Sequence, residues 1–546
     1  MKFDYTKENL PPGDQRLQRL FEIIPGLSSW TILIGLVLLS FLKPVWAAVF
    51  VIAFYLFWLF KLFYMTIFLV LSFYRLGTEK STAWPERIKG IDGLEHYMND
   101  LERLKWGRDI GDRLSLHVHK QELQKLKQSN HLPPPSKDIF HLVILPVIKE
   151  SRDIVEPGIL SISQQEFPAD QIIVLFALEE RADDEIKNAI FELEKKYKGR
   201  FLNISTVIHP GNLPNEARVK GANVTYAAKK AAKYLKGRNI PYENVIVSCF
   251  DADTVVNDNY FSALTYYFMV TPQRLRSSFQ PIPVYHNNIW DVPGFARVME
   301  TGSSFFQLIE ATNPERLITF SSHSMSFKAL VDVDYWPTDM ISDDSAIYWK
   351  SYIHFDGNYQ VIPMYVTLSM DVAGSDNLLD TMRTVYKQKR RWAWGVENFP
   401  IMGRAFLKAD QIPIYDRARH LFKLFEGHIS WATWGFLLTF IGWLPALFAQ
   451  KEFVHSVVYY NAPRITGTIF NLASLSLFIS IILSVRLLPK KKTKHSFLKK
   501  CKHALEWLSM PLIVVFFSAL PALDAQTRLM LGKYMEFWVT VKTRKK

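Results

Sequence analysis

The sequence predicts an α/β domain with a mainly parallel sheet, inserted between N-terminal and C-terminal transmembrane helices. Long apolar runs lie near both ends of the 546-residue chain, and a more polar stretch lies between them. Within that stretch, short apolar runs rich in β-branched residues alternate with polar helical stretches, which is typical of parallel strands covered on both faces. Hydrophobic residues make up 49% of the chain and charged residues 21%, so the two classes are segregated along the sequence.

The charge and the cysteine content narrow the class of protein. The net charge of +13 falls largely beside the apolar runs, so we interpret it as the basic flanks of membrane spans rather than a nucleic-acid surface. Cys249 and Cys501 are too few for a disulfide framework, and both are expected to be reduced. The first twenty residues show no signal-peptide pattern, so the first span is expected to serve as the anchor. The densest basic tract comprises Lys490, Lys491, Lys492, Lys494, Lys499, Lys500 and Lys502.

The N-terminal part predicts a hairpin of two transmembrane helices. Residues 1–26 form a polar segment, and residues 27–76 are almost continuously apolar. A single helix over that run would extend about 75 Å, far more than a hydrocarbon core of about 30 Å. Lys43-Pro44 is the natural break, which gives spans near 27–42 and 45–73. Basic residues flank the outer ends of both spans, and this predicts that those ends are cytoplasmic.

A helical linker and the α/β domain follow. Residues 77–137 are charged and helix-prone, and Pro133-Pro134-Pro135 closes them as a stiff spacer. The α/β domain is expected over residues 138–372. Its predicted strands are 141–145, 172–178, 202–208 and 244–250, and its predicted helices include 182–198 and 215–236.

The C-terminal part predicts interfacial helices over 373–428, two transmembrane helices within 429–488 and a mixed segment over 489–546. The spans are expected at 429–449 and 465–488. The apolar run from Trp507 to Leu520 is short for a span, so a re-entrant or surface hairpin fits it as well. The tail ends in Lys542, Arg544, Lys545 and Lys546, which predicts a cytoplasmic C-terminus. Four spans then place the α/β domain on the cytoplasmic side of an inner or plasma membrane.

Asp251-Ala252-Asp253 is a candidate metal site after the predicted strand at 244–250. Alternate strand residues point to the same face, so both carboxylates are expected to point the same way at the carboxyl end, where open α/β sheets bind ligands. Mg²⁺ or Mn²⁺ prefers few carboxylates together with phosphate oxygens, and it can neutralise a leaving diphosphate. The alternative is a chance match that merely caps a turn.

Asp344 is a candidate general base. It ends the run Ile341-Ser342-Asp343-Asp344, just before the helical stretch 345–353. An acceptor hydroxyl needs a positioned base to take its proton, and a second acid beside that base can raise its pKa. The alternative is that Ser342 or Asp343 only caps the following helix.

Gln388, Arg391 and Trp392 are expected to share one face of a helix. Arginine can donate two hydrogen bonds to a pyrophosphate, and an indole offers an apolar platform for a sugar ring. The alternative is a helix whose aromatic and basic side chains lie at the lipid headgroups for that reason alone. We expect this helix to be interfacial in either case.

Four other polar residues could line the same site. Glu150 and Glu179 follow the first two predicted strands, where a carboxylate could accept from a ribose or a base, or could simply be a solvated loop acid. Lys220 opens a predicted helix and could approach a diphosphate as a point charge. His323 is most simply a locally hydrogen-bonded histidine, and it also falls where an acceptor could rest.

Taken in this order, the motifs resemble those of membrane-bound members of glycosyltransferase family 2, the class that contains cellulose, hyaluronan and chitin synthases. The resemblance covers roughly residues 138–400. It implies a GT-A fold, a nucleotide-sugar donor such as a UDP-sugar, a divalent cation (Mg²⁺ or Mn²⁺), and transfer with inversion at the anomeric carbon. It also implies that Asp344 is the base and that Trp392 borders the acceptor. The matching set is Lys220 with Asn223, Asp251-Ala252-Asp253, Asp344 in the place of the T-E-D aspartate, and Q-x-x-R-W at 388–392.

A further match lies in the tail. The sequence of residues 537–542, Phe-Trp-Val-Thr-Val-Lys, resembles the F-x-V-T-x-K gating loop of bacterial cellulose synthases. This implies that Thr540 and Lys542 cover the bound donor. Three features depart from the family: Ser342-Asp343-Asp344 replaces T-E-D, residues 177–181 replace the usual D-D-G-S, and four spans form a smaller bundle than polymer-exporting synthases usually have.

The predicted function is an inverting, metal-dependent membrane glycosyltransferase that acts on a lipid-linked or growing polysaccharide acceptor. The expected partners are membrane lipids and possible export or accessory subunits, and nucleic acid is not expected. A second hypothesis is a non-catalytic nucleotide-binding membrane protein on a degenerate transferase fold; such a protein has no physical reason to retain Asp251, Asp253, Asp344 and Arg391 together. A transporter requires polar groups inside its spans, and the sequence has few there. The sugar, the acceptor and the choice between single and repeated transfer stay open.

Overall fold

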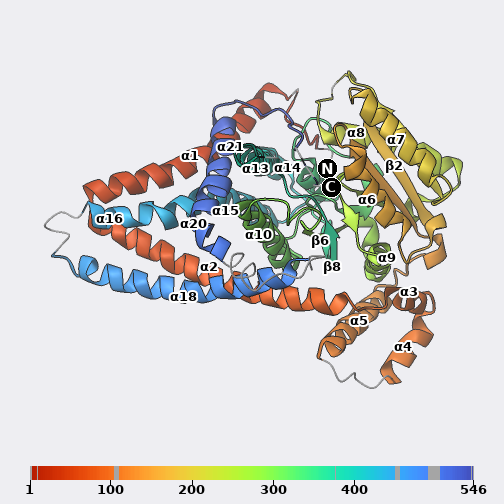
Figure 1. The fold of residues 1–546 in the computed structure, drawn as a ribbon, viewed down its shortest axis with the longest axis horizontal. Helices are drawn as coiled ribbons and strands as arrows, with labels where there is room; N and C mark the ends of the chain where they lie inside the picture. The colour runs from red at the N-terminus through yellow and green to blue at the C-terminus, as the bar shows by residue number, and fades with distance from the viewer. Residues whose placement is uncertain are drawn as a thin grey trace.

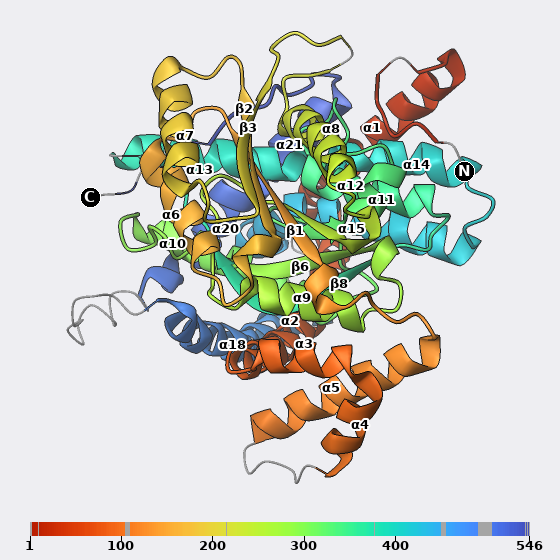
Figure 2. The same cartoon turned by 90° about the vertical axis from the view of Figure 1, so that its right-hand side faces the viewer.

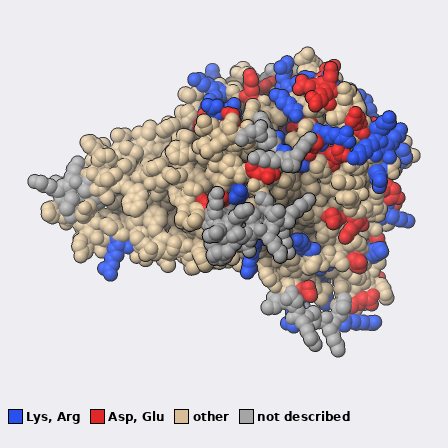
Figure 3. Space-filling model, viewed as in Figure 1, with Lys and Arg blue, Asp and Glu red and all other residues tan. Residues whose placement is uncertain are grey.

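The structure is a computed structural model, and it separates the apolar helices from the sheet (Figure 1). It describes residues 3–8, 10–103, 110–214, 216–375, 377–448, 455–489, 505–540, 542 and 544. The lysine tract over 490–502, with Cys501, and Lys545 and Lys546 lie outside these residues. Charged side chains gather over the sheet end of the molecule, and few lie on the surface of the long helices (Figure 3).

One eight-stranded sheet forms the centre of the α/β domain, in the order β3-β2-β1-β4-β7-β6-β8-β5. The first four strands, which occupy the predicted positions, are all parallel: β1 (Phe140–Val147), β2 (Ile172–Glu179), β3 (Asn203–His209) and β4 (Val245–Cys249). The other four are β5 (Val255–Val256), β6 (Ser277–Val284), β7 (Ser324–Ser326) and β8 (Gln360–Ser369). β6 and β8 are parallel, whereas β7 runs antiparallel to both β4 and β6. The predicted fold class, a mainly parallel sheet between apolar helices, is confirmed.

Helices cover both faces of the sheet, and alternate strand residues enter two different cores. In β1, Val143, Leu145 and Val147 join one core, and Leu142 and Ile144 join the other. This alternation is what the period of a strand requires when both faces are buried. The helices of the domain include α6 (Arg152–Ser163), α7 (Asp184–Tyr197), α8 (Lys220–Gly237), α9 (Tyr260–Val270), α10 (Gly294–Ala311), α11 (Phe327–Asp332) and α12 (Asp343–His354).

A small helical unit projects from the sheet, below it in the view of Figure 2. It consists of α3 (Trp84–Asp92), α4 (Leu94–Arg103) and α5 (Ile110–Ser129), in the region predicted as a helical linker. Trp84 anchors the unit: its indole is fully buried, with its ring centre 5.0 Å from that of Tyr266 and 5.6 Å from that of Tyr267, both on α9. The unit therefore belongs to the core of the α/β domain rather than to a free spacer.

Among the residues that the structure describes, four helices are long and apolar enough to cross a membrane: α1 (Pro12–Leu42), α2 (Pro44–Glu79), α18 (Val457–Leu487) and the helical run Trp507–Met530. The helix α15 (Ile414–Thr439) and the run Ile441–Leu447 form a fifth candidate, bent by 48° at their junction. The helix α1 begins well before the predicted first span, because the polar residues after Pro12 continue it without a break. α13 (Leu378–Ala393) and α14 (Asn398–Lys408) lie between the sheet and α15 in sequence.

The run Trp507–Met530 extends past its predicted end at Leu520. Pro521 stands in the first turn of α21 (Leu520–Met530), where a proline needs no N–H partner, and a π-helical turn at Val515–Ala519 joins it to α20 (Met510–Val514). Figure 1 shows α20 and α21 running across the long helices α1, α2 and α18 rather than along them. At one end Trp507 stacks on Phe305 of α10, with ring centres 6.1 Å apart, and at the other Arg19 donates to the Leu529 carbonyl at 2.8 Å. This placement favours a helix that lies along the membrane surface.

Contacts near both ends of the chain place those ends on one side of the membrane. Thr6 donates to Asp339 at 2.5 Å, and the ammonium of Lys542 lies 2.6 Å from Asp253. Both partners belong to the α/β domain, so residues 6 and 542 share its side of the membrane. The number of complete crossings must therefore be even, and the three C-terminal candidates cannot all cross.

Gly158 of α6 lets that helix approach the turn that carries Asp253. A Cβ at this position would lie 2.5 Å from the backbone oxygen of Thr254, which cannot move aside as a side chain can. Gly158→Ala is therefore expected to lower the free energy of unfolding by about 1–3 kcal/mol. Gly302→Ala in α10 is the control, because nothing lies within 4 Å of its Cβ; it is expected to stabilise by about 0.5–1 kcal/mol. Thermal unfolding of both purified variants measures the difference, and equal melting temperatures would contradict the close approach.

Candidate active site

Asp251 and Asp253 lie in a turn, not in a strand. β4 ends at Cys249, and the Thr254 N–H donates to the Asp251 carbonyl at 2.9 Å, which closes the turn before β5. We expected the alternation of side chains along a strand to give the two carboxylates a common direction. This expectation is wrong, because neither residue lies in the strand. The turn does stand at the carboxyl end of β4, where the sheet changes from parallel to antiparallel pairing. Ligands of open α/β sheets bind at such an end.

Lys220, the first residue of α8, brings three carboxylates together. Its ammonium lies 3.1 Å from Asp251 Oδ1, 2.7 Å from Asp344 Oδ1 and 3.6 Å from Asp343 Oδ2. Asp343 and Asp344 form the first turn of α12. Gly221 permits this approach, since a Cβ there would lie 2.2 Å from the carbonyl oxygen of the turn before α12 and 3.2 Å from Asp343 Cβ. Residues from three distant segments thus form one charged cluster.

The charges of this cluster displace the pKa values of its members. Burial alone would raise the pKa of Asp251, but the ammonium groups of Lys220 and Lys542 lower it well below its usual range. Burial raises the pKa of Asp343; Lys220 opposes this rise, and Asp344 and Asp251 add to it. Burial would lower the pKa of Lys220, but the surrounding carboxylates raise it well above its ordinary value. The cluster therefore holds a charged lysine, an ionised Asp251 and a second acid that keeps its proton to unusually high pH.

Asp253 is fully buried and pairs with the C-terminal tail. Its Oδ2 accepts the Asp371 N–H at 2.7 Å, and its Oδ1 lies 2.6 Å from the Lys542 ammonium. Asp371 in turn binds Arg544, whose guanidinium donates to both carboxylate oxygens at 2.9–3.1 Å. Two ion pairs, Lys542–Asp253 and Arg544–Asp371, therefore hold the tail on this turn.

The aspartate pair fits a divalent cation in charge and in donor type. Carboxylate oxygens suit Mg²⁺ and Mn²⁺, and an ammonium already lies at this position: Lys542 pairs with Asp253 and lowers the pKa of Asp251. Among the residues that the structure describes, no group of three or more His, Cys, Asp and Glu side chains could hold a metal ion. A cation at Asp251 and Asp253 would therefore need phosphate oxygens to complete its coordination.

Arg391 joins this cluster from α13. It donates to Thr540 Oγ1 at 3.4 Å, and its guanidinium lies 5.3 Å from the ring centre of Phe537, so the tail lies against this helix. Arg391 also contributes to the lowered pKa of Asp251. Gln388, one turn earlier on α13, is buried. The structure thus brings Arg391, Thr540 and Asp251 to one place.

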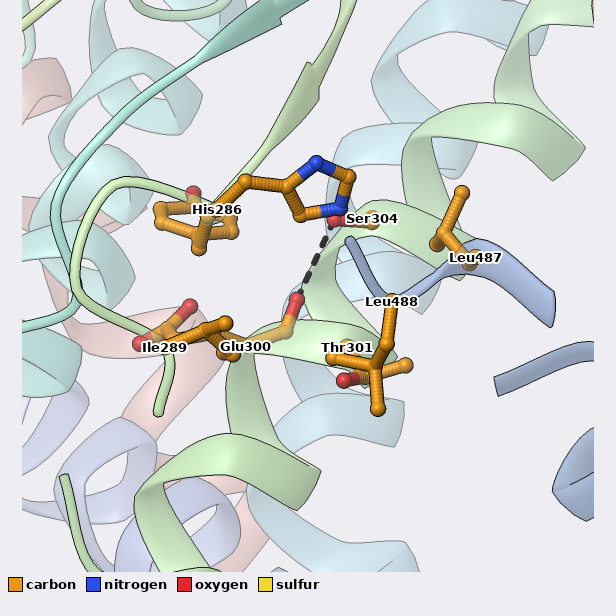
Figure 4. Close-up of a pocket in the computed structure, with 8 residues that line it drawn as sticks. His286, Ile289, Glu300, Thr301, Ser304, Leu487 and Leu488 are labelled. Atoms are coloured by element: carbon orange, nitrogen blue, oxygen red, sulfur yellow. Dashed lines mark hydrogen bonds between the residues drawn. The ribbon is translucent and has the colours of Figure 1, made fainter. Parts of the chain in front are cut away.

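Trp392 is half-buried and held by two neighbours. The centre of the Trp392 ring lies 6.3 Å from that of Tyr285 and 3.7 Å from the Lys389 ammonium. Lys389 is itself paired with Glu300 of α10 at 2.9 Å, and both side chains are buried. A small pocket beside Tyr285 and Glu300 is also lined by His286, Leu487 and Leu488 (Figure 4). It lies between Tyr285, which contacts Trp392, and the end of α18.

Glu179, at the end of β2, lies in a second pocket with groups that can both donate and accept hydrogen bonds. Its Oε2 lies 3.2 Å from the Arg181 guanidinium and 3.5 Å from His209 Nδ1. His209 Nε2 lies 2.9 Å from Glu216. Burial would lower the pKa of His209, but Glu179 and Glu216 raise it. A pocket with this mixture of hydrogen-bonding groups suits the nucleobase or the ribose of a nucleotide.

Glu150 and His323 are occupied by local contacts. Glu150 Oε2 accepts the N–H groups of Ile148 and Lys149 at 2.8 and 3.0 Å, so it ties down its own loop. His323 is fully buried, and its Nδ1 lies 3.0 Å from the Phe320 carbonyl. Burial lowers the pKa of His323, which favours the neutral ring. Roles for these two residues in donor and acceptor binding stay predictions.

The structure adds residues that the sequence did not single out. Ser321 donates to Asp251 Oδ2 at 2.5 Å, and Glu397 binds the backbone that leads into α12. Lys542 and Arg544 stand two positions apart in the sequence, and alternate residues of an extended segment point the same way, so this spacing could have found Arg544. Asp371 and Glu397 carry no such signal, because only the fold brings them to the site.

Known proteins share part of this sequence. No family model matches the chain. The curated relative poly-beta-1,6-N-acetyl-D-glucosamine synthase of Staphylococcus epidermidis is 25% identical over 246 residues, which are 44% of this chain and 51% of the relative. The chain spans about half the length of the curated relatives it matches (51% and 60%). These relatives confirm the resemblance to membrane-bound glycosyltransferases of family 2 that the motifs predict.

Two solved structures show a more distant similarity. Mannosyltransferase PcManGT from Pyrobaculum calidifontis, in complex with GDP-Man and Mn²⁺, is 14% identical with a TM-score of 0.39; the match covers 80% of this chain and 99% of that chain. S. aureus TarS 1–349, in complex with UDP-GlcNAc, is 13% identical with a TM-score of 0.35; the match covers 72% and 93% of the two chains. At these scores, neither similarity adds to what the sheet and the side-chain contacts of this chain show.

Asp343→Asn is expected to change the pH dependence of stability. An acid whose pKa is raised on folding binds its proton more tightly in the folded state. The free energy of unfolding therefore falls as the pH rises above 3.8, the ordinary pKa of an aspartate. A tenfold difference in proton affinity between the folded and unfolded states corresponds to about 1.4 kcal/mol. The wild-type melting temperature should therefore fall between about pH 5 and about pH 8 by more than that of Asp343→Asn.

Asp410→Asn, at an exposed position, is the control and should keep the wild-type slope. Parallel slopes for wild type and Asp343→Asn would contradict the raised pKa.

Proposed function

We propose that this chain is a membrane glycosyltransferase that moves a sugar from a nucleotide-sugar donor to a glycan or lipid-linked acceptor at the membrane surface. The observation that carries the proposal is the cluster at the end of β4. Lys220, Asp251, Asp344 and Lys542 meet there with Arg391, although these residues come from separate segments of the chain. The curated relatives named above are polysaccharide synthases, which supports the same reaction class.

Basic groups on three elements would bind the donor diphosphate. Lys220 opens α8, Arg391 comes from α13, and Lys542 and Arg544 come from the tail. A diphosphate is a better partner for a lysine or arginine than a single carboxylate is, because it offers several charged oxygens. We infer that the donor draws these groups away from Asp251, Asp253 and Asp344, and that the tail then closes over it.

Asp344 would act as the general base. Its carboxylate lies 2.7 Å from Lys220 at the edge of the cluster, and about a quarter of the side chain (24%) is exposed, so an acceptor hydroxyl can reach it. The acceptor oxygen would attack the anomeric carbon as Asp344 takes its proton, and the bond from that carbon to the diphosphate would break. A single displacement of this kind inverts the configuration of the anomeric carbon.

Asp251 and Asp253 would hold a divalent cation, Mg²⁺ or Mn²⁺, which when bound supplies charge neutralisation at the leaving diphosphate. Trp392 would offer its indole to a sugar ring of the acceptor, with Lys389 and Tyr285 holding the indole in place. The pocket around Glu179, Arg181 and His209 would receive the nucleoside. The basic flanks of the spans favour a cytoplasmic site, and the first donor to test is UDP-N-acetylglucosamine, because the curated relatives make poly-N-acetylglucosamine.

Asp344→Asn is expected to abolish transfer while donor binding survives. The amide keeps the shape of the side chain but cannot take a proton, and loss of a general base typically costs about 100- to 10,000-fold in rate. Incubation of purified membranes with radiolabelled UDP- and GDP-sugars measures transfer into lipid or polymer, and calorimetry with the nucleotide measures binding. Asp170→Asn is the control, because Asp170 is exposed at the amino end of β2, at the opposite edge of the sheet. Persistent turnover in Asp344→Asn would rule out this base.

Asp253→Ala is expected to remove the metal dependence of donor binding. A single remaining carboxylate is a poor ligand set for Mn²⁺, so added Mn²⁺ should raise nucleotide affinity in the wild type but not in the variant. Titration of the nucleotide with and without Mn²⁺ gives both affinities. A variant that retains the full Mn²⁺ effect would count against a metal role for this aspartate.

A further inference from the structure

Glu397 holds the backbone that leads into the proposed base. Its Oε1 accepts the Ile341 N–H at 3.0 Å, the Ser342 N–H at 2.9 Å and the Ser342 hydroxyl at 2.8 Å. Its Oε2 accepts the Trp394 indole N–H at 3.0 Å. Only 2% of Glu397 is exposed, so these bonds form away from water.

The contact with Ser342 replaces the usual helix cap. Ser342 stands at the N-cap of α12, where a serine hydroxyl normally accepts a backbone N–H of the first turn. Here the hydroxyl makes no such bond and donates to Glu397 instead. Asp343 and Asp344 follow directly, so the start of α12, and with it the direction of the Asp344 side chain, depends on Glu397.

The N-terminal segment completes this network. Lys7 reaches Glu397 Oε2 with its ammonium at 3.0 Å. Tyr5 donates to Asn398 at 2.8 Å, and Asn398 donates in turn to the Ser342 hydroxyl at 3.1 Å. Thr6 donates to Asp339 at 2.5 Å. Tyr5, Thr6 and Lys7, which precede the first long helix, therefore each contact a residue close to the start of α12.

The ion pair between Lys7 and Glu397 is largely buried, so its loss would destabilise the site. Burial would lower the pKa of Lys7, but Glu397 raises it above its ordinary value, so the ammonium stays charged. Glu397 is the only acidic partner that the described contacts give to that ammonium. Without Lys7, the Glu397 carboxylate would be buried with neutral donors alone, which is unfavourable for a charge in a low-dielectric site.

We propose that Glu397, together with Lys7 of the N-terminal segment, is a positioning device for the base Asp344, so that residues 5–7 form part of the active site. The inference rests on the proposed function, because it assigns Glu397 and Lys7 to the orientation of that base. A displacement of about 1 Å at a catalytic group can cost about 100-fold in rate, so a carboxylate that accepts three bonds from the two residues before Asp343 is a strong control point.

Glu397→Gln and Lys7→Met test the proposal. Glutamine has one accepting atom where glutamate has two, so it leaves some of the five donors facing an N–H group. Glu397→Gln is expected to lower kcat about 10- to 100-fold with little change in the KM for the donor. Lys7→Met should act in the same direction, and Lys7→Arg should restore most of the rate. Because the two residues act as a pair, the double variant should be no slower than Glu397→Gln.

Lys408→Met is the matched control. The Lys408–Asp14 pair, at 2.6 Å, joins α14 to α1, the helices that directly follow Glu397 and the N-terminal segment, but the lysine side chain is 43% exposed. Its loss is expected to leave kcat unchanged. A fall in kcat for Lys408→Met equal to that for Lys7→Met would show that docking of the N-terminal segment in general, not the Lys7–Glu397 pair, controls the rate, and would overturn the proposal.

Hydrogen exchange separates this inference from the proposed function. The Ile341 and Ser342 amides donate to Glu397, so their exchange should quicken in Glu397→Gln and Lys7→Met by more than that of amides elsewhere in the domain, which report any general loss of stability. If the wild type transfers no sugar, the proposed function fails, and the exchange rates still report on the network. If the wild type is active and both variants keep its kcat and its amide protection, the positioning role is refuted.

Discussion

A buried ammonium among carboxylates is the interaction on which this site depends. The carboxyl groups of Asp251, Asp343 and Asp344 meet around one ammonium, because like charges repel and burial removes the water that would screen them. Lys220 supplies that cation from the first turn of α8. The same constraint applies at the neighbouring pair, where Lys542 and Arg544 of the tail neutralise Asp253 and Asp371. The acids of the site are therefore stable only with basic partners drawn from elsewhere in the chain.

This requirement links the two ends of the chain to the sheet. The tail is held by Asp253 and Asp371, and the N-terminal segment by Asp339 and Glu397. Basic groups that now pair with carboxylates are also suited to phosphate oxygens, so a nucleotide-sugar donor would compete for them. The proposed reaction thus begins with an exchange of partners, in which the donor takes the cations and leaves Asp344 to the acceptor.

Much of the fold followed from local patterns. The four parallel strands, β1 to β4, were predicted because their residues are continuously apolar, and a strand buried on both faces needs that composition. β5 and β7 are only two and three residues long, and β6 contains two prolines, so no local pattern predicted them. Of the site, Lys220, Asp251, Asp253, Asp344 and Arg391 were named from the order of motifs. Their pairing was not, because it joins residues far apart in the chain, by 31 positions between Lys220 and Asp251 and by 124 between Lys220 and Asp344.

The sequence by itself determined the segregation of apolar and charged segments, the four parallel strands and the residue types that can carry the chemistry. These are local properties, which periodicity and composition report directly. Only the tertiary structure decided that Asp251 and Asp253 lie in a turn, that Asp343 rather than Asp344 is buried, and that Glu397 and Lys7 hold the backbone before α12. Burial and ion pairing are set by what packs against a residue, and those neighbours come from distant parts of the chain.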